Sequence, residues 1–115
     1  MTAIDLNKEL FEKHINDKNK PVLVDFWAPW CVYCRRIAPA LNLLAEQYGD
    51  VLTISKVNID VEQELAIQEQ IEVIPTLIIY QGGEALASIV APESKAQLEA
   101  FIKETLKLND SKYKL

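Results

Sequence analysis

The chain has 115 residues, of which 50% are hydrophobic and 25% are charged, which fits one globular domain and excludes a fibrous or disordered class. Its 12 basic and 17 acidic residues give a net charge of −5, which argues against nucleic acid or an anionic membrane as the main partner. No apolar run approaches the roughly 18 residues of a membrane span, and the first residues do not resemble a secretory signal. We therefore expect one domain over residues 1–115, located in the cytoplasm, with no nucleic-acid or membrane partner.

The first half of the chain predicts helices alternating with strands. Asn7 is a candidate N-cap for a first helix that includes Phe11, and Pro21 separates this helix from an apolar run at 22–27. A run that is apolar almost throughout is typical of a strand covered on both faces, so residues 22–27 predict a central strand. A second helix begins near Cys34 and keeps one apolar face. The residues on that face are Ile37, Leu41, Leu44, Ala45 and Tyr48.

The second half predicts another buried strand and then a hairpin. Residues 51–57 read as a strand, and Asp60 is a candidate cap for a short helix after it. The apolar runs 76–80 and 85–90 flank the pair 82–83, which is Gly-Gly. Such a pair is typical of a two-residue turn, so these two strands are expected to be antiparallel.

The C-terminal part predicts one more helix. Ser94 and Gln97 have the spacing of a capping box ahead of an amphipathic stretch, and residues 109–115 are expected to form a loose tail. The predicted fold class is therefore α/β. It has a mixed central sheet, with parallel strands and a C-terminal antiparallel hairpin, flanked by helices on both faces.

Cys31 and Cys34 are the only cysteines, and their spacing cannot staple distant parts of a fold. Cys31 follows the central strand and opens the second helix, where free backbone N–H groups and the helix dipole favour a thiolate. Cys34 lies one turn further along, on the inward face, and is expected to be more buried. This asymmetry predicts that Cys31 attacks a substrate disulfide and that Cys34 then resolves the mixed disulfide.

Two other interpretations of the cysteine pair stay open, namely half of a zinc site and two inert core thiols. A zinc site needs about four ligands, whereas the chain offers these two cysteines and the distant His14. Inert thiols are usually scattered through a core rather than placed at a strand-to-helix junction. Reversible thiol chemistry, with no metal and no bound organic cofactor, is the favoured interpretation.

Asp25 lies inside the apolar central strand, six residues before the first cysteine, and burial is expected to raise its pKa. Lys56 alternates with Leu52 and Ile54, so its side chain is predicted to point inward, toward Asp25. One interpretation is a buried ion pair that serves only the fold. The other is that Asp25, tuned by Lys56, accepts the proton of Cys34 as that thiol becomes a nucleophile.

Taken together, these features resemble the thioredoxin family. The matching segments keep the family's order and spacing across nearly the whole chain, and they are residues 24–31 with Cys34, 37–39, 56–60, 74–76 and 83–84. The resemblance implies a thioredoxin fold and protein-disulfide reduction, with Cys31–Cys34 as a redox-active disulfide and with Asp25 and Lys56 handling protons. It also implies disulfide-containing target proteins and a thioredoxin reductase as partners, and we expect a monomer.

The resemblance further assigns residues around the cysteines. It implies that Trp27 and Trp30 flank the active loop. It implies that Pro75 is cis and faces the cysteines, and that the backbone of Ile74 pairs with an extended substrate.

Two departures from the family pattern leave reactivity and partner choice open. Val32 and Tyr33 stand between the cysteines where thioredoxins normally carry Gly-Pro. Val90 and Ala91, followed by proline, stand beside the substrate groove where the family usually has Val-Gly-Ala. Tyr33 restores a backbone N–H that a proline would lack, which predicts an extra donor near the Cys31 sulfur and a more oxidising couple.

Three functions are therefore weighed. The favoured one is a protein-disulfide reductase and dithiol electron carrier. The alternatives are a scaffold or binding subunit of the same fold, in which the cysteines are incidental, and a more oxidising isomerase-like protein.

Overall fold

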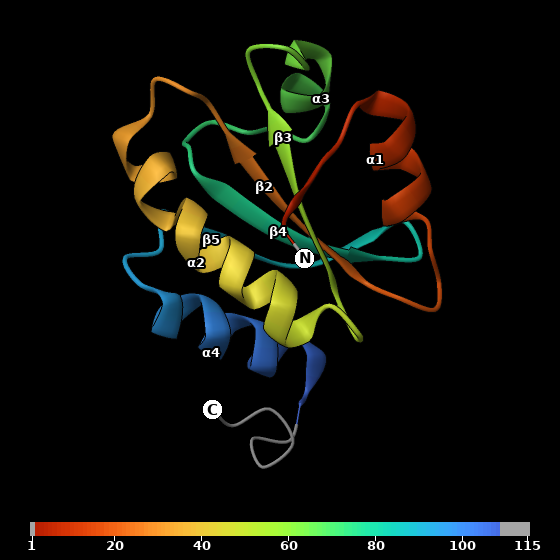
Figure 1. Ribbon diagram of the computed structural model, residues 1–115. Helices are drawn as coiled ribbons and strands as arrows, with labels where there is room; N and C mark the ends of the chain where they lie inside the picture. The colour runs from red at the N-terminus through yellow and green to blue at the C-terminus, as the bar shows by residue number, and fades with distance from the viewer. Residues whose placement is uncertain (1, 109–115) are drawn as a thin grey trace.

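The computed structural model describes residues 2–108, which form one sheet with helices packed on both sides (Figure 1). The strands are β1 (Ile4–Asp5), β2 (Val22–Trp27), β3 (Thr53–Asn58), β4 (Thr76–Gln81) and β5 (Glu84–Val90). The helices are α1 (Lys8–Ile15), α2 (Val32–Tyr48), α3 (Gln63–Gln68) and α4 (Lys95–Leu106). Within this range, no helix has the length and apolar character needed to cross a membrane. The tail expected at 109–115 lies outside the described residues.

The sheet is mixed, as predicted, and its strand order is β1-β3-β2-β4-β5. Strands β1, β3 and β2 run parallel, whereas β4 is antiparallel to both β2 and β5. The predicted central strand is confirmed, because β2 lies between β3 and β4. The edge strand β1 was not predicted from the sequence, since a strand of two residues has no periodicity to detect.

Both faces of β2 are buried because successive side chains point to opposite sides of the sheet. Val22, Val24 and Phe26 pack in the cluster that includes Phe11 of α1, whereas Leu23 packs with the inward residues of α2 and α4. Figure 1 shows α1 and α3 on one side of the sheet and α2 and α4 on the other. The same alternation puts residue 25 of β2 on the face that α2 covers.

Helix α2 is anchored along the face that the sequence predicted. All five predicted inward residues of this helix, together with Cys34, are buried. At its C-terminal end the Tyr48 hydroxyl donates to Glu99 of α4 at 2.8 Å. The amides of Val51 and Leu52 both donate to the Tyr48 carbonyl at 2.9 Å. These two bonds close the helix, which is why β3 begins at Thr53 rather than at the predicted residue 51.

Two predicted helix caps are confirmed. The Asn7 side chain accepts a hydrogen bond from the Leu10 amide at 2.9 Å, and Ser94 accepts one from the Gln97 amide at 3.1 Å. The return bond of the second cap differs from the usual capping box, because Gln97 Oε1 accepts from the amide of Glu93 rather than from that of Ser94.

The predicted cap at Asp60 is wrong. Helix α3 begins at Gln63, and Glu62 occupies the N-cap position without a side-chain cap bond. The Asn58 side chain accepts the Asp60 amide at 2.9 Å, so this segment forms a local turn before the helix starts. The Asp60 carboxylate instead accepts a hydrogen bond from Trp30 Nε1 at 3.2 Å.

The Gly-Gly hairpin between β4 and β5 is confirmed. Gly82 and Gly83 have φ values of 59° and 84°, the left-handed conformation that favours glycine in a two-residue turn. Their amides donate to the carbonyls of Asp17 and Ile15 at 2.9 and 2.7 Å. The hairpin tip is therefore tied to the loop after α1.

We predict that the two glycines tolerate alanine unequally. An added Cβ at Gly83 would lie 2.9 Å from Asn16 Oδ1, whereas at Gly82 it would lie 3.7 Å from Lys18 Cγ. Asn16 has little freedom to retreat, because its Nδ2 donates to the Glu12 carbonyl at 2.8 Å. Gly82→Ala should lower the free energy of unfolding by about 1 kcal/mol and Gly83→Ala by about 2 kcal/mol or more. Urea unfolding measures both, and equal losses would contradict the prediction.

Candidate active site

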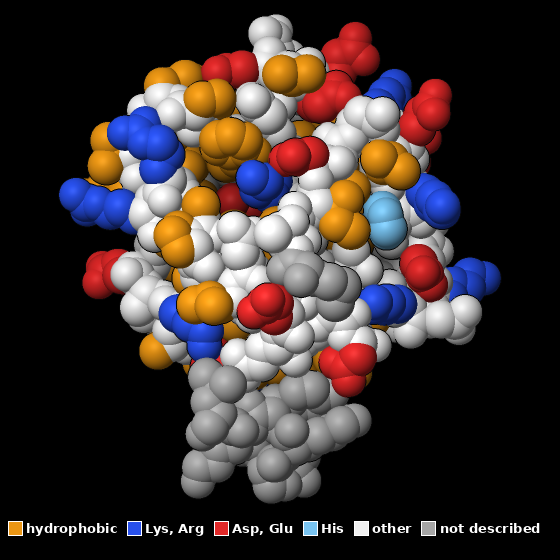
Figure 2. Space-filling view, in the orientation of Figure 1, with side chains coloured by type: hydrophobic (Ala, Val, Ile, Leu, Met, Phe, Trp, Pro, Cys, Tyr) orange, Lys and Arg blue, Asp and Glu red, His pale blue; other side chains and the backbone are white. Residues whose placement is uncertain are grey.

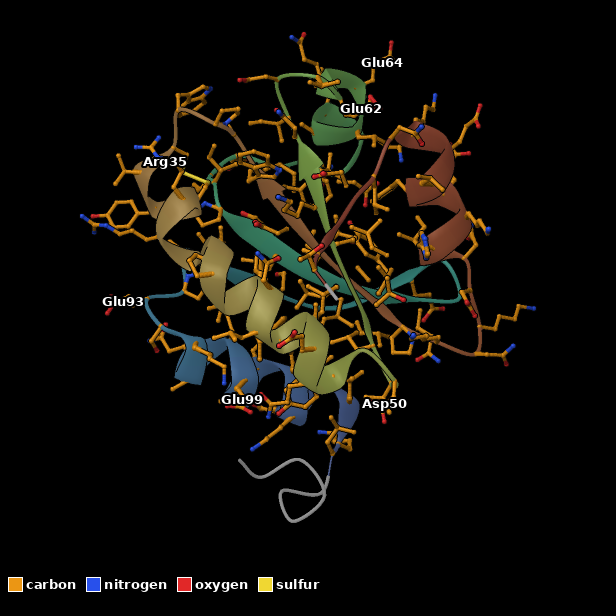
Figure 3. All side chains as sticks on the ribbon, viewed as in Figure 1. Arg35, Asp50, Glu62, Glu64, Glu93 and Glu99 are labelled. Carbon is orange, nitrogen blue, oxygen red and sulfur yellow. A yellow bond between two sulfur atoms is a disulfide. The ribbon has the colours of Figure 1, made fainter. Side chains whose placement is uncertain are left out.

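The two cysteines form a disulfide at the N-terminus of α2, with their Cα atoms 5.2 Å apart (Figure 3). Cys31 is the N-cap residue, and its sulfur accepts a hydrogen bond from the Cys34 amide at 3.2 Å. The first turn of α2 has no acidic side chain to offset the positive end of the helix dipole. Once the disulfide is reduced, this environment favours a thiolate at Cys31.

The expected difference in burial between the cysteines is present but small. Cys31 is 7% exposed and Cys34 is 2% exposed, so Cys31 is the slightly more exposed of two buried residues. The two cysteines form a buried cluster with Ala28, against which the partly buried Trp27 and Ile74 pack.

Val32 and Tyr33 are surface residues, with 48% and 63% of their areas exposed. The expected donation from the Tyr33 amide to the Cys31 sulfur is not found among the described residues, where the Cys34 amide fills that role. The Arg36 guanidinium lies 5.3 Å from the centre of the Tyr33 ring. Sequence reasoning missed this contact, although residues three apart on a helix are neighbours.

The loop before Cys31 is held at two points. Arg35 Nη1 donates to the Pro29 carbonyl at 2.8 Å, which ties the first turn of α2 to the loop. On the other side, the bond from Trp30 Nε1 to Asp60 ties the loop to the end of β3. The Trp30 ring itself remains 65% exposed beside the disulfide loop. The Trp30 ring is therefore an exposed apolar surface whose position is set by its hydrogen bond to Asp60.

The segment before β4, residues 74–75, lies next to Cys31. The Ile74–Pro75 peptide bond is cis, and the Cys31 sulfur lies 4.0 Å from the Ile74 carbonyl oxygen. The Ala91 amide donates to the Pro75 carbonyl at 2.8 Å, and Val90 is 52% exposed at the end of β5. Ile74 thus lies beside Cys31, and the neighbouring Pro75 is bonded to Ala91 at the end of β5. We call these residues, together with the exposed Trp30 and Val90, the rim.

Asp25 is only 2% exposed, and burial raises its pKa to about 7, while the positive charge of Lys56 acts to lower that pKa. Its Oδ1 atom is buried without a hydrogen-bond partner in the described part of the chain. Lys56 is its cross-strand neighbour, as expected, but the two side chains form no direct ion pair. The Lys56 ammonium instead lies 3.7 Å from Asp5 and 4.9 Å from the centre of the Trp27 ring. Sequence reasoning missed Asp5 altogether.

The half-zinc interpretation of the cysteine pair finds no further ligands. Within residues 2–108, no three His, Cys, Asp or Glu side chains come together as a metal site. His14 lies on α1, on the opposite side of the sheet from α2 (Figure 1).

Comparisons with known proteins agree with this geometry. The Thioredoxin family model matches residues 2–104. A thioredoxin of Alicyclobacillus acidocaldarius subsp. acidocaldarius is 42% identical over 106 residues, which cover 92% of this chain and 97% of that protein. A thioredoxin of Acidithiobacillus ferridurans is 43% identical over 101 residues, covering 88% and 94%. A bifunctional thioredoxin reductase/thioredoxin of Mycobacterium leprae (strain TN) is 40% identical over 96 residues, which are 84% of this chain and 21% of that protein.

The similarity extends over most of the chain, and the fold and the Cys-x-x-Cys disulfide agree with it. The chain therefore belongs to the thioredoxin family and is a protein-disulfide oxidoreductase, a dithiol reductase whose redox-active pair is Cys31–Cys34.

Proposed function

We propose that Cys31 is the attacking thiolate and Cys34 the resolving thiol in the reduction of protein disulfides. The Cys31 thiolate bonds to one sulfur of the target as the target S–S bond breaks, and the other target sulfur leaves as a thiolate. Cys34 then attacks the Cys31 sulfur, so that the Cys31–Cys34 disulfide forms and the second target sulfur is released. Two electrons pass to the target. The position of Cys31 at the positive end of α2, with the more accessible sulfur, carries this assignment.

Asp25 is proposed as the acceptor of the Cys34 proton. A group with a pKa near 7 can take up a proton and release it again at neutral pH, which an ordinary aspartate cannot. Asp25 lies on the sheet face that α2 covers, as does the inward side of Cys34. Lys56 is proposed to tune this group through its charge.

The exposed rim around Cys31 is proposed as the binding surface for target proteins. Trp30 and Val90 are exposed apolar side chains, and the Ile74 carbonyl oxygen lies 4.0 Å from the Cys31 sulfur. An extended target segment can pair with the backbone of Ile74 beside Pro75, with Ala91 at the edge of the same rim and Val32 and Tyr33 on the helix side. Trp27 packs against the buried cluster of Ala28, Cys31 and Cys34.

The electron donor is proposed to be a thioredoxin reductase. The relative from Mycobacterium leprae is named for both a thioredoxin reductase and a thioredoxin, which supports this pairing. We also propose that the chain acts as a single-domain monomer in the cytoplasm, where a reducing environment keeps a dithiol available. Analytical ultracentrifugation and cell fractionation test these two points.

The first prediction concerns the two cysteines. With dithiothreitol as donor, the protein should accelerate insulin reduction, and Cys31→Ser should abolish that acceleration because the attacking thiolate is gone. Cys34→Ser should instead accumulate a mixed disulfide on Cys31, detectable by mass spectrometry. Unchanged turnover by Cys31→Ser would favour a scaffold in which the cysteines are incidental.

The second prediction concerns Asp25 and pH. The folded-state pKa of about 7 exceeds the unfolded value of about 3.9, so the stability contributed by the protonated carboxyl is present at low pH. That contribution is lost as the pH rises from about 4 to about 7. The free energy of unfolding of Asp25→Asn does not have this pH dependence. Relative to the wild type, the variant should therefore become more stable by up to about 4 kcal/mol between pH 4 and pH 8.

Urea unfolding of the oxidised protein at both pH values measures this difference, and the exposed Asp50→Asn serves as the matched control. The same Asp25→Asn variant should resolve mixed disulfides more slowly, on the order of 10-fold or more. A variant that keeps wild-type stability at both pH values would show that Asp25 ionises like an exposed carboxyl. A normal resolution rate would remove Asp25 as the proton acceptor.

The third prediction concerns the target-binding rim. Val90→Asp should lower kcat/KM for insulin reduction by about 5-fold, because a charge replaces apolar surface that the target covers. Ile67→Asp is the matched control, since Ile67 is 78% exposed on α3 and lies outside the rim. Equal effects of the two substitutions would place target binding elsewhere.

A further inference from the structure

Three charged residues lie side by side across the sheet. Asp5 of β1 is in register with Lys56 of β3, and Lys56 is in register with Asp25 of β2. Neighbours in register on parallel strands share a face, so the Lys56 side chain stands between two carboxylates. One of these, Asp5, has 82% of its side chain exposed, whereas Asp25 is 2% exposed.

The Lys56 ammonium is held on the outer side of this row. Its ion pair is with Asp5, at 3.7 Å, and it lies over the ring of Trp27. None of the ion pairs in the described part of the chain joins Lys56 to Asp25. The ion pair of Lys56 is therefore with the exposed carboxylate and not with the buried one.

The site opens to solvent through a cavity of about 420 Å³ that Asp5, Trp27, Lys56 and Glu62 help to line. Figure 2 shows a hollow near the middle of this face where hydrophobic, basic and acidic side chains meet. Because the cavity is open, the ammonium can stay hydrated beside Asp5 without entering the protein interior.

The other groups that face this row are few. Glu62 precedes α3, and its Oε1 accepts the Lys8 amide at 3.0 Å, so its carboxylate is directed toward α1. Helix α2 contributes Cys34, which titrates only when the disulfide is reduced, and β4 contributes the apolar Leu77. Lys56 is the charged group that acts on the pKa of Asp25.

We propose that Asp5 is a positioning residue for the redox centre, whose carboxylate holds the Lys56 ammonium over Trp27 and away from Asp25. The distance from the ammonium to the buried carboxyl then stays long enough for Asp25 to be protonated and deprotonated near neutral pH. A direct contact would keep Asp25 ionised throughout, because opposite charges attract strongly where water is scarce. The consequence of this inference for catalysis rests on the proposed role of Asp25 as the proton acceptor.

The test is the titration of Asp25 in the oxidised protein, followed by carbon NMR of labelled aspartate. Asp5→Asn keeps the shape of the side chain but releases Lys56, and should lower the titration midpoint of Asp25 by about 0.5 pH unit. Glu62→Gln, which removes a second carboxylate from the same cavity, should shift the midpoint by less than half as much. Lys56→Met should raise the midpoint, and adding Asp5→Asn to it should cause little further change.

Two results would overturn the proposal. One is an Asp25 midpoint that Asp5→Asn leaves unmoved. The other is a shift of full size in the Lys56→Met background, since Asp5 would then act through its own charge and not by positioning Lys56. The pH profile of mixed-disulfide resolution separates this proposal from the role of Asp25. If Asp5→Asn moves the titration but not the profile, Asp5 still positions Lys56 and Asp25 is not the proton acceptor.

Discussion

The burial of β2 on both faces is the constraint on which the redox centre depends. This strand pairs with β3 and β4 in the sheet, and helices cover both of its faces. Packing therefore fixes its position and direction. Its C-terminal end leads within four residues to Cys31, which caps α2. The Cys31 sulfur therefore lies at the positive end of a helix that follows, after a short loop, a strand packed on both faces.

The same constraint explains the buried carboxyl. Side chains alternate along β2, so a residue on the α2 face must occupy position 25, and in this chain it is an aspartate. An apolar residue there would stabilise the fold, because burying a carboxyl without full hydrogen bonding costs free energy. The proposed gain is a proton acceptor whose pKa lies near 7 on the sheet face that α2 covers. With the proposed role of Asp25, stability and proton transfer make opposite demands on one residue.

Sequence reasoning worked best where one pattern extends over many residues. The apolar face of α2, the run in β2 and the Gly-Gly turn each determine a local structure, and tertiary packing reinforces them. It failed at Asp60, because the amide of Glu62, which a cap at Asp60 would use, donates to the Asn58 carbonyl and the helix begins only at Gln63. It also failed to find the partner of Lys56, because Asp5 reaches Lys56 only through the pairing of β1 with β3. A strand of two residues leaves no pattern from which that pairing follows.

The departures from the family pattern, at residues 32, 33 and 91, lie at exposed positions. Ala91 has a φ of 45°, the left-handed conformation that suits the glycine usual at this position, and its amide still donates to Pro75. The alanine adds a methyl group at the rim and adopts a backbone conformation that costs about 1 kcal/mol. Val32 and Tyr33 likewise sit in a regular first turn of α2 with their side chains exposed. The proposed target-binding rim therefore differs from the usual one of the family in its exposed side chains.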